Sequence, residues 1–200
     1  MVDIAPLYTP EPEAKKLRLD IGCGKTAPED MVKAAMSFAG ASYPFEWEGV
    51  DAIDFGQKHV HDVRKGLPFI EDGSVDSVRS SHFVEHLTGT ERIYFFNELF
   101  RVMKVGAMAQ IITPHWSHAC AYGDPTHQWP PMSEWYAMYL NKAWRDANAP
   151  HVAYTCDFDY AEGRSWDGRL NGRNPEYMAM AMNSQVNASR DLIVTLTKRG

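Results

Sequence analysis

A glycine-rich turn near the start of the chain, in the stretch LRLDIGCGKT (residues 17–26), has the residue types of a site for a charged ligand. Gly22, Gly24 and Ala27 satisfy the G-x-G-x-x-G/A spacing of dinucleotide sites, where backbone N–H groups at a helix start receive a pyrophosphate. The tripeptide GKT matches the end of a phosphate-binding P-loop, but that motif requires a glycine where Leu19 stands. The P-loop interpretation therefore fails, and the dinucleotide interpretation stays open.

Two acidic residues help to distinguish the ligands that such a turn can hold. Asp20 lies two positions before the first glycine, where its carboxylate would repel a pyrophosphate and attract a cation. S-Adenosylmethionine carries an ammonium and a sulfonium and no phosphate, so Asp20 favours this cofactor over a dinucleotide. Asp51 ends the next predicted strand, 27 residues after Gly24, whereas the acidic residue of a dinucleotide site follows its glycines by about 20 residues.

The pentapeptide HFVEH, His82 to His86, matches H-x-x-E-H, a zinc-peptidase motif with two histidines as ligands and the glutamate as base. A helix is not expected here, because His82 leaves a predicted strand and the TGT at residues 88–90 would soon break a helix. A catalytic zinc also needs a third ligand, and none is evident in the sequence. We therefore expect no metal, and a structural or supporting role for Glu85 and His86.

Strand-like and helix-like segments alternate along most of the chain, which is typical of an α/β sheet. Apolar runs predict strands, and apolar residues three and four positions apart predict helices. The expected strands cover residues 17–21, 47–50, 58–62, 74–80, 107–113, 152–158 and 192–196. Helices are expected over residues 29–38 and 133–145. Another helix is expected between them, with Thr90 as its N-cap and Gly106 at its end. Between the last two strands we expect a loop that contains glycine and arginine, and a methionine-rich segment, 177–182, that fills the core.

The composition is that of one globular domain. Of the 200 residues, 44% are hydrophobic and 23% are charged, and the net charge of −6 argues against a nucleic-acid substrate. Cys23, Cys120 and Cys156 form no C-x-x-C motif and cannot all pair within one chain, which favours a reducing cytoplasm. Residues 1–16, with three prolines, are expected to form an irregular leader. No signal peptide is evident and no apolar run approaches the length of a membrane span, so we expect no membrane partner.

Four segments, in this order, carry a resemblance to a known family: LRLDIGCG, EGVDAID, HDVRKGLPFIEDGSVDSVRSSHFVEHL and ELFRVMKVGAMAQIITP. Together they resemble class I S-adenosylmethionine-dependent methyltransferases, specifically a small bacterial and phage-type group with an LPF-D-S-D…EHL segment. The resemblance covers residues 17–114 and implies a Rossmann-like α/β fold. It implies a mostly parallel seven-stranded sheet with a C-terminal antiparallel hairpin and helices on both faces. It also implies a single methyltransferase domain over residues 17–200. Residues 17–114 would bind the cofactor, and residues 115–200 would supply the acceptor-side loops, helices and last two strands.

The resemblance places S-adenosyl-L-methionine at the carboxyl ends of the strands. Asp51 would accept both ribose hydroxyls, Asp62 and the backbone N–H of Val63 would bind adenine, and Ser80 and Ser81 would lie beside the sulfonium. The implied cofactor-binding residues are Asp20, Gly22, Cys23, Gly24, Asp51, Ala52, Asp62, Val63, Ser80 and Ser81.

The acceptor side is expected in a segment rich in histidine and tryptophan that follows the fifth predicted strand. His115, His118 and His127 fall within thirteen residues of one another, and an oxygen or nitrogen acceptor benefits from a nearby base. We interpret His127, His115 and His82 as the catalytic candidates. The tryptophans suit a planar or ring-bearing small molecule, and SSHF at residues 80–83 replaces the [DN]-P-P-[YFW] motif of enzymes that methylate DNA amines.

Two other function classes stay open at this point. One is a non-catalytic protein that binds S-adenosylmethionine or S-adenosylhomocysteine, because the sequence has clearer motifs for binding the cofactor than for binding an acceptor. The other is an NAD(P)-dependent oxidoreductase, which has no use for Asp20. The acceptor and the oligomeric state do not follow from the sequence.

Overall fold

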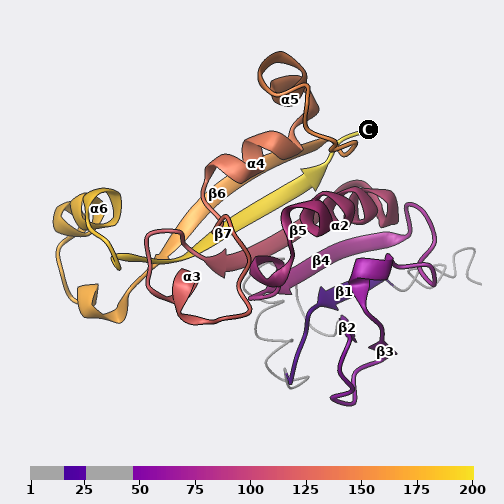
Figure 1. Cartoon of the computed structure of the whole chain (residues 1–200), viewed down its shortest axis with the longest axis horizontal. Helices are drawn as coiled ribbons and strands as arrows, with labels where there is room; N and C mark the ends of the chain where they lie inside the picture. Colours follow the sequence, from indigo (N-terminus) through magenta and orange to yellow (C-terminus); the bar gives the residue numbers. More distant parts are fainter. Residues whose placement is uncertain (1–15, 26–46) are drawn as a thin grey trace, which may run out of the picture.

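A seven-stranded sheet organises the chain in the computed structural model, which describes residues 16–25 and 47–200 (Figure 1). The strands are β1 (Arg18–Ile21), β2 (Trp47–Asp51), β3 (His59–Val60), β4 (Val75–Ser81), β5 (Met103–Pro114), β6 (Phe158–Trp166) and β7 (Ser189–Lys198). They lie in the order β3-β2-β1-β4-β5-β7-β6. The first five strands are parallel, and β7 is antiparallel to both β5 and β6. The predicted fold class, with its C-terminal antiparallel hairpin, is confirmed.

The central strands form where apolar residues alternate with polar or charged ones, all of them covered in the fold or nearly so. All four residues of β1 are buried, and β4 and β5 add Val78, Ala109 and Ile111 to the same core. Strands of a parallel sheet are buried on both faces in this way, and the charged residues of β1 are buried with the apolar ones. The two acidic positions singled out above therefore stand in or at the end of rigid strands, Asp20 within β1 and Asp51 as the last residue of β2.

Helix α2 (Gly89–Val102) packs its apolar face on the sheet through Phe95, Phe96 and Leu99. Its N-cap is Thr88 and not Thr90 as predicted, because Thr88 and Glu91 form a reciprocal capping box. This spacing satisfies two backbone donors at once, which a cap at Thr90 would not. The helix ends at Val102, and β5 then begins at once, four residues earlier than predicted.

The region after β5 contains short helices and the last two strands. The helices are α3 (Cys120–Gly123), α4 (Trp135–Leu140), α5 (Lys142–Asn148), η3 (Gly168–Leu170) and α6 (Pro175–Ser184). The single helix predicted over 133–145 is divided at Asn141, whose side chain caps α5 by accepting from the Trp144 N–H. In α6 only Ala181 is buried and Met180 is exposed, so the methionine-rich segment is not the core filler that we predicted.

Strand β6 is the main error in the predicted element order. Residues 152–157 run to the sheet without joining it, and the strand covers Phe158–Trp166, where a loop was expected. Phe158 is buried, but most of the strand is exposed, because β6 is an edge strand. In Figure 1 β6 and β7 form a long pair with α4 alongside and α6 at one end.

Some predictions fall outside the described residues. These are the helix over residues 29–38 and nearly all of the leader. Within residues 16–25 and 47–200, no helix has the length and apolarity needed to cross a membrane.

Candidate functional site

The carboxyl ends of β1, β2, β4 and β5 meet at one edge of the sheet, because these strands are parallel. This edge carries the glycine turn after β1, Asp51 at the end of β2, His82 after β4 and Pro114 at the end of β5. The strand order reverses between β1 and β4, and ligands of open α/β sheets bind in the crevice outside such a reversal. The predicted cofactor and acceptor residues therefore converge on the edge where the topology places a ligand.

The glycine turn is tied to the end of β2. The N–H of Gly22 donates to the Val50 carbonyl at 2.8 Å, and the N–H of Gly24 donates to Asp51 Oδ2 at 2.9 Å. Asp51 Oδ1 accepts from the Ile53 N–H at 2.9 Å. Each carboxylate oxygen has more than one lone pair, so Asp51 can still accept from a ligand hydroxyl. Ala52 follows it on the exposed loop.

The thiol within this turn is neutral. Burial, with the charges of Asp20 and Asp51, raises the pKa of Cys23 to about 11. Because the thiolate is the nucleophilic form of cysteine, Cys23 is not a nucleophile near neutral pH.

Asp20 forms an ion pair with a residue that the sequence analysis did not single out. It stands beside Arg79 of β4 in the sheet register, and Arg79 Nη1 lies 3.2 and 3.1 Å from the two carboxylate oxygens. The Asp20 side chain is 1% exposed. Burial raises its pKa, and the charge and hydrogen bond of Arg79 act in the opposite direction. The negative charge of Asp20 is thus balanced by the protein itself, which weakens the inference that it attracts a cationic ligand.

Removing this partner has a pH-dependent effect on stability. Arg79→Met is expected to lower the free energy of unfolding by about 3 kcal/mol at pH 7, because it leaves a buried carboxylate uncompensated. The folded-state pKa of Asp20 is raised already and rises further without Arg79, so stability falls as pH rises above the unfolded value of about 3.9. Urea unfolding at pH 4.5 and pH 7 measures this, with the larger loss expected at pH 7. Adding Asp20→Asn to the Arg79→Met variant should recover most of the lost stability. Equal losses at pH 4.5 and pH 7 would contradict the predicted pH dependence.

Asp62 and Val63 lie at the start of the short helix η1 (Val63–Lys65). The Asp62 side chain caps this helix and binds the Arg64 guanidinium through both oxygens, each at 2.9 Å. The hydrogen bonds from Arg64 lower the pKa of Asp62, so the carboxylate is ionised near neutral pH. A ligand bound by Asp62 would share it with Arg64.

Ser80 and Ser81 end β4, as predicted, and their side chains differ in environment. The Ser80 hydroxyl is fully buried and makes no hydrogen bond within the described part of the chain, whereas Ser81 is half-buried. Ser80 stands beside Ile21 of β1 and Ile111 of β5 in the register.

Two of the three catalytic candidates share one cavity of about 550 Å³ at the ends of β4 and β5. His82 and His127 line it together with Glu85, His86 and Asp191. His82 has a left-handed backbone with φ 54°, and its ring nitrogens lie 3.4 Å from Glu85 Oε1 and 3.7 Å from Asp191 Oδ1. The contact with Glu85 raises the pKa of His82. The cavity lies at the carboxyl ends of the strands, where ligands of open α/β sheets bind.

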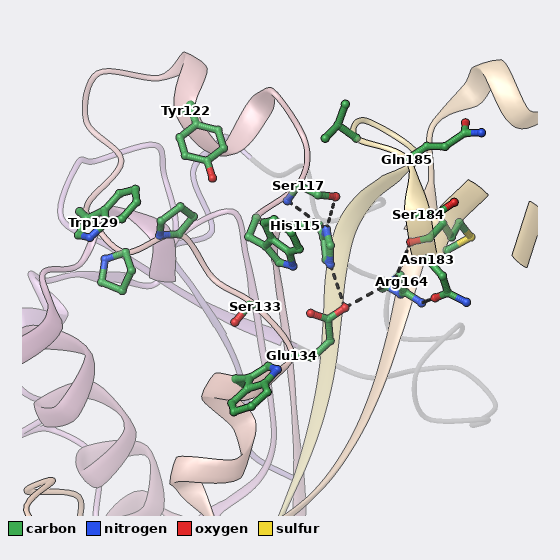
Figure 2. Close-up of a pocket in the computed structure, with 16 residues that line it drawn as sticks. His115, Ser117, Tyr122, Trp129, Ser133, Glu134, Arg164, Asn183, Ser184 and Gln185 are labelled. Carbon is green, nitrogen blue, oxygen red and sulfur yellow. Dashed lines mark hydrogen bonds and ion pairs between the residues drawn. The ribbon is translucent and has the colours of Figure 1, made fainter. Parts of the chain in front are cut away.

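The third candidate, His115, lies apart from this pair. It lines a second cavity of about 560 Å³, which three tryptophans, Trp116, Trp129 and Trp135, also line. Both ring nitrogens of His115 are engaged, Nδ1 with Ser117 Oγ at 2.8 Å and Nε2 with Glu134 Oε1 at 2.9 Å (Figure 2). A ring held at both nitrogens is poorly placed to take a proton from an acceptor.

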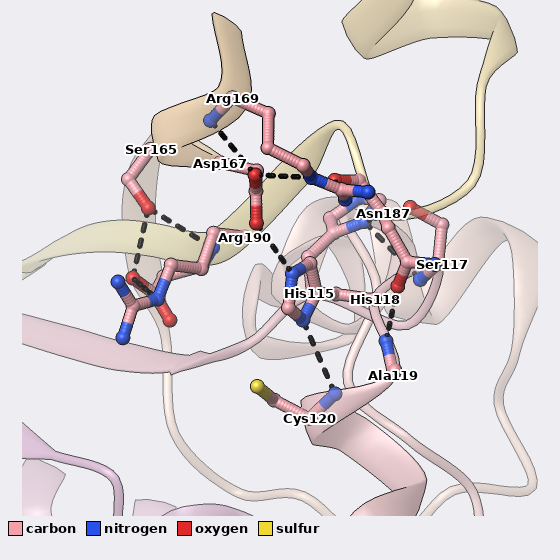
Figure 3. Close-up of polar contacts among 11 residues, drawn as sticks. His115, Ser117, His118, Ala119, Cys120, Ser165, Asp167, Arg169, Asn187 and Arg190 are labelled. Atoms are coloured by element: carbon pink, nitrogen blue, oxygen red, sulfur yellow. Dashed lines mark hydrogen bonds and ion pairs between the residues drawn. The ribbon is translucent and has the colours of Figure 1, made fainter. Parts of the chain in front are cut away.

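His118 has a structural role in this structure. Its Nδ1 accepts from the Cys120 N–H, so its Nε2 carries the proton and donates to Asp167 at 3.3 Å (Figure 3). Nearby, the Ala119 N–H donates to the Asn187 side chain at 2.6 Å. These bonds fasten the loop after β5 to the segments before and after α6.

One buried arginine that the sequence analysis missed organises the first cavity. Arg92 of α2 is 5% exposed and donates to four backbone carbonyls, those of Val84, Glu85, Gln128 and Pro130. It therefore holds the turn after β4 against the loop that carries His127. No sequence signal identifies it, because an arginine on an amphipathic helix usually faces solvent.

Comparison with known proteins shows the fold. No protein-family model matches the chain, and no curated protein matches it. Among solved structures, a SAM-dependent methyltransferase from Archaeoglobus fulgidus is 20% identical, with a TM-score of 0.63 over 92% of this chain and 86% of that chain. Geranyl diphosphate C-methyltransferase from Streptomyces coelicolor A3(2), solved with Mg²⁺, geranyl diphosphate and S-adenosyl-L-homocysteine, is 17% identical. Its TM-score is 0.54 over 92% of this chain and 72% of that chain. The chain thus has the fold of these methyltransferases.

Proposed function

We propose that this protein is an S-adenosylmethionine-dependent methyltransferase that transfers the methyl group to an oxygen or nitrogen of a small molecule. The strand order β3-β2-β1-β4-β5-β7-β6, with β7 antiparallel, carries this proposal. A dinucleotide-binding sheet has the order 3-2-1-4-5-6, with its strands mostly parallel. The structures that share the fold of this chain include a SAM-dependent methyltransferase and one solved with S-adenosyl-L-homocysteine.

The proposed cofactor site uses the turn after β1 and the loops after β2 and β3. Backbone at Gly22 and Gly24 would contact the methionine moiety, Asp51 the ribose hydroxyls, and Asp62 with the Val63 N–H the adenine. Both oxygens of Asp51 already hold backbone N–H groups, which fixes the orientation that a vicinal diol needs. Because Asp20 pairs with Arg79, its proposed role is to hold the end of β1 and β4 in register.

The acceptor would occupy the cavity lined by His82 and His127. Methyl transfer is an in-line displacement with a good leaving group, so the protein mainly aligns the acceptor and excludes water. A base near the acceptor assists when its oxygen or nitrogen is protonated. His82 and His127 are the bases we propose, and His115 is a supporting residue of the second cavity. The spacing of Cys23, Cys120 and Cys156, which form no C-x-x-C motif, fits a reducing compartment such as the cytoplasm.

The first test of the proposal is calorimetric titration of the whole chain with S-adenosylmethionine, NADH and ATP. Binding of the sulfonium compound alone is expected. Binding of NADH without S-adenosylmethionine would overturn the proposal in favour of an oxidoreductase. Release of S-adenosylhomocysteine in the presence of a panel of small-molecule acceptors then separates an enzyme from a protein that only binds the cofactor.

Asp51→Ala is expected to weaken S-adenosylmethionine binding about tenfold or more, because the ribose hydroxyls lose their acceptor. Asp54→Ala is the matched control, since Asp54 also accepts a backbone N–H two residues on, that of Gly56 at 2.9 Å, on the same exposed loop. Calorimetry on both variants measures the effect, and the control should bind as the wild type does. Unchanged affinity in the Asp51 variant would remove this residue from the site.

A further inference from the structure

We propose that Glu85, His86 and His127 form a binding site for a divalent transition-metal ion. One ligand atom from each of the three side chains lies within 4.8 Å of the others. Glu85 and His86 belong to the short helix η2 (Val84–His86), and His127 comes from the loop after α3. Two imidazoles and one carboxylate are a frequent set of protein ligands for zinc and for non-haem iron.

Hydrogen bonds set both imidazoles in the tautomer that binds metals. The Thr126 hydroxyl donates to Asp124 Oδ1 at 2.6 Å, so its oxygen must accept from His86 Nδ1 at 2.8 Å. His127 Nδ1 lies 3.2 Å from the Ala121 carbonyl, which can only accept. Each ring therefore carries its proton on Nδ1 and a lone pair on Nε2. Metal-binding histidines are oriented in this way by partners behind the ring.

Glu85 supplies the second observation that points to a ligand. The residue is 4% exposed, and neither carboxylate oxygen makes a hydrogen bond within the described part of the chain. Its carboxylate lies 3.4 Å from His82 Nδ1 and near the buried charge of Arg92, whose Nη2 donates to the Glu85 backbone carbonyl. A buried carboxylate whose oxygens make no hydrogen bond is costly, and a bound cation would add to the compensation that His82 and Arg92 give it. The carboxylate lines the same cavity as the two imidazoles.

The dimensions fit after a small movement of the side chains. Ligand atoms about 2.1 Å from a tetrahedral zinc lie about 3.4 Å apart, compared with the limit of 4.8 Å found here. Side-chain rotations that close this gap by about 1 Å are small for exposed or half-buried rings. Three protein ligands leave a coordination position open for water or substrate.

This metal set differs from the zinc-peptidase interpretation of HFVEH. That motif needs His82 and His86 as ligands on one helix, with Glu85 as base. Here His82 lies outside the helix with a left-handed backbone, and Glu85 takes the ligand position. The third ligand, which the sequence did not reveal, is His127. The loop that carries it is attached to η2 by the Gln128 N–H, which donates to the Glu85 carbonyl at 2.8 Å.

Under the proposed function, on which this step rests, the metal would bind the acceptor oxygen. With the metal bound, His127 acts as a ligand and not as a base. Coordination lowers the pKa of a bound hydroxyl, whose proton leaves to solvent. The oxygen then forms a bond to the methyl carbon while the carbon–sulfur bond breaks. The electron pair of that bond stays on sulfur and gives S-adenosylhomocysteine. The acceptor class is therefore a hydroxylated or enolic small molecule that can bind a metal through oxygen.

The test is titration of the untagged full chain with Co²⁺, followed by visible absorption, and with Zn²⁺, followed by calorimetry. One Co²⁺ per chain, displaced by Zn²⁺, is expected. Glu85→Gln, His86→Asn and His127→Asn should each weaken binding at least about tenfold, because each removes a ligand. His151→Asn, an exposed histidine outside the cluster, is the matched control and should bind as the wild type does.

Thr126→Val covers the case in which the buried Glu85 variant fails to fold. It changes an exposed residue and removes the partner of His86 Nδ1 together with the hydroxyl that donates to Asp124, so about tenfold weaker Co²⁺ binding is expected. Absence of Co²⁺ binding, or binding that none of these substitutions changes, would overturn the site. Calorimetry with S-adenosylmethionine on the same samples separates the two proposals. Metal binding without cofactor binding would refute the methyltransferase alone, and the reverse would refute the metal site alone.

Discussion

Arg92→Met is expected to lower the free energy of unfolding by about 2–4 kcal/mol, because four backbone carbonyls lose a charged hydrogen-bond donor. The guanidinium reaches the carbonyls of Pro130 at 2.6 Å, Gln128 at 3.1 Å and Val84 at 3.3 Å. The carbonyls of Val84 and Glu85 keep other donors, the N–H groups of Leu87 and Gln128. Methionine fills a similar volume but donates nothing, so the Gln128 and Pro130 carbonyls lose the donor that the described part of the chain gives them.

Urea unfolding followed by circular dichroism measures this loss. Arg199→Met is the matched control, since Arg199 is half-exposed and pairs with Asp157 and Asp159. Exposed ion pairs contribute about 0–1 kcal/mol, so the control should lose less than that. Arg92→Lys should resemble Arg92→Met, because one ammonium cannot reach carbonyls on two segments. A loss in Arg92→Met no larger than in the control would show that the carbonyls find other partners.

The same substitution is expected to separate the two histidine-bearing segments of the first cavity. Arg92 joins the turn that carries Glu85 and His86 to the loop that carries His127. Its loss should weaken Co²⁺ binding in protein that is still folded, while S-adenosylmethionine binding is kept. Arg92 is thus a positioning residue, and the difference between the two titrations distinguishes positioning from simple destabilisation.

The sequence predicted the part of the fold in which burial determines residue type. Strands β1, β2, β4 and β7 were placed within a few residues, because each of them contains buried apolar residues that the sequence pattern marks. Strand β6 was missed for the opposite reason, since an edge strand with mostly exposed side chains has no apolar pattern. The alternation Val152, Tyr154, Cys156 belongs instead to an extended segment outside the sheet, in which Cys156 packs into the core.

The candidate site was predicted in part for a similar reason. Residues at strand ends, such as Asp51 and His82, are placed by the strand that precedes them, so the sequence locates them. His115 and His127 lie in one loop segment and could not be assigned to separate cavities from the sequence. Their separation depends on long-range bonds, from His115 to Glu134 and from Arg92 to the carbonyls beside His127.

Gly22→Ala is expected to lower the free energy of unfolding by about 2–5 kcal/mol. The glycine has φ +69°, and a left-handed backbone costs a residue with a Cβ about 1–2 kcal/mol. A Cβ at this position would lie 2.4 Å from Phe83 Cγ, and overpacking of this kind adds about 1–3 kcal/mol. The Phe83 ring cannot yield easily, because it packs edge-on against Phe95 of α2 with 5.8 Å between ring centroids.

Gly24→Ala separates the two causes of this loss. Gly24 has φ +55°, but a Cβ there would meet no atom within 4 Å, so only the backbone cost of about 1–2 kcal/mol is expected. Thermal and urea unfolding of both variants give the comparison. Equal losses would show that the glycine turn and Phe83 are not in contact. A larger loss in Gly22→Ala would show that Gly22 is required for packing, whatever ligand the turn holds. Because Phe83 lies between His82 and Glu85, any movement forced by the new methyl group would also reach the acceptor cavity and weaken Co²⁺ binding.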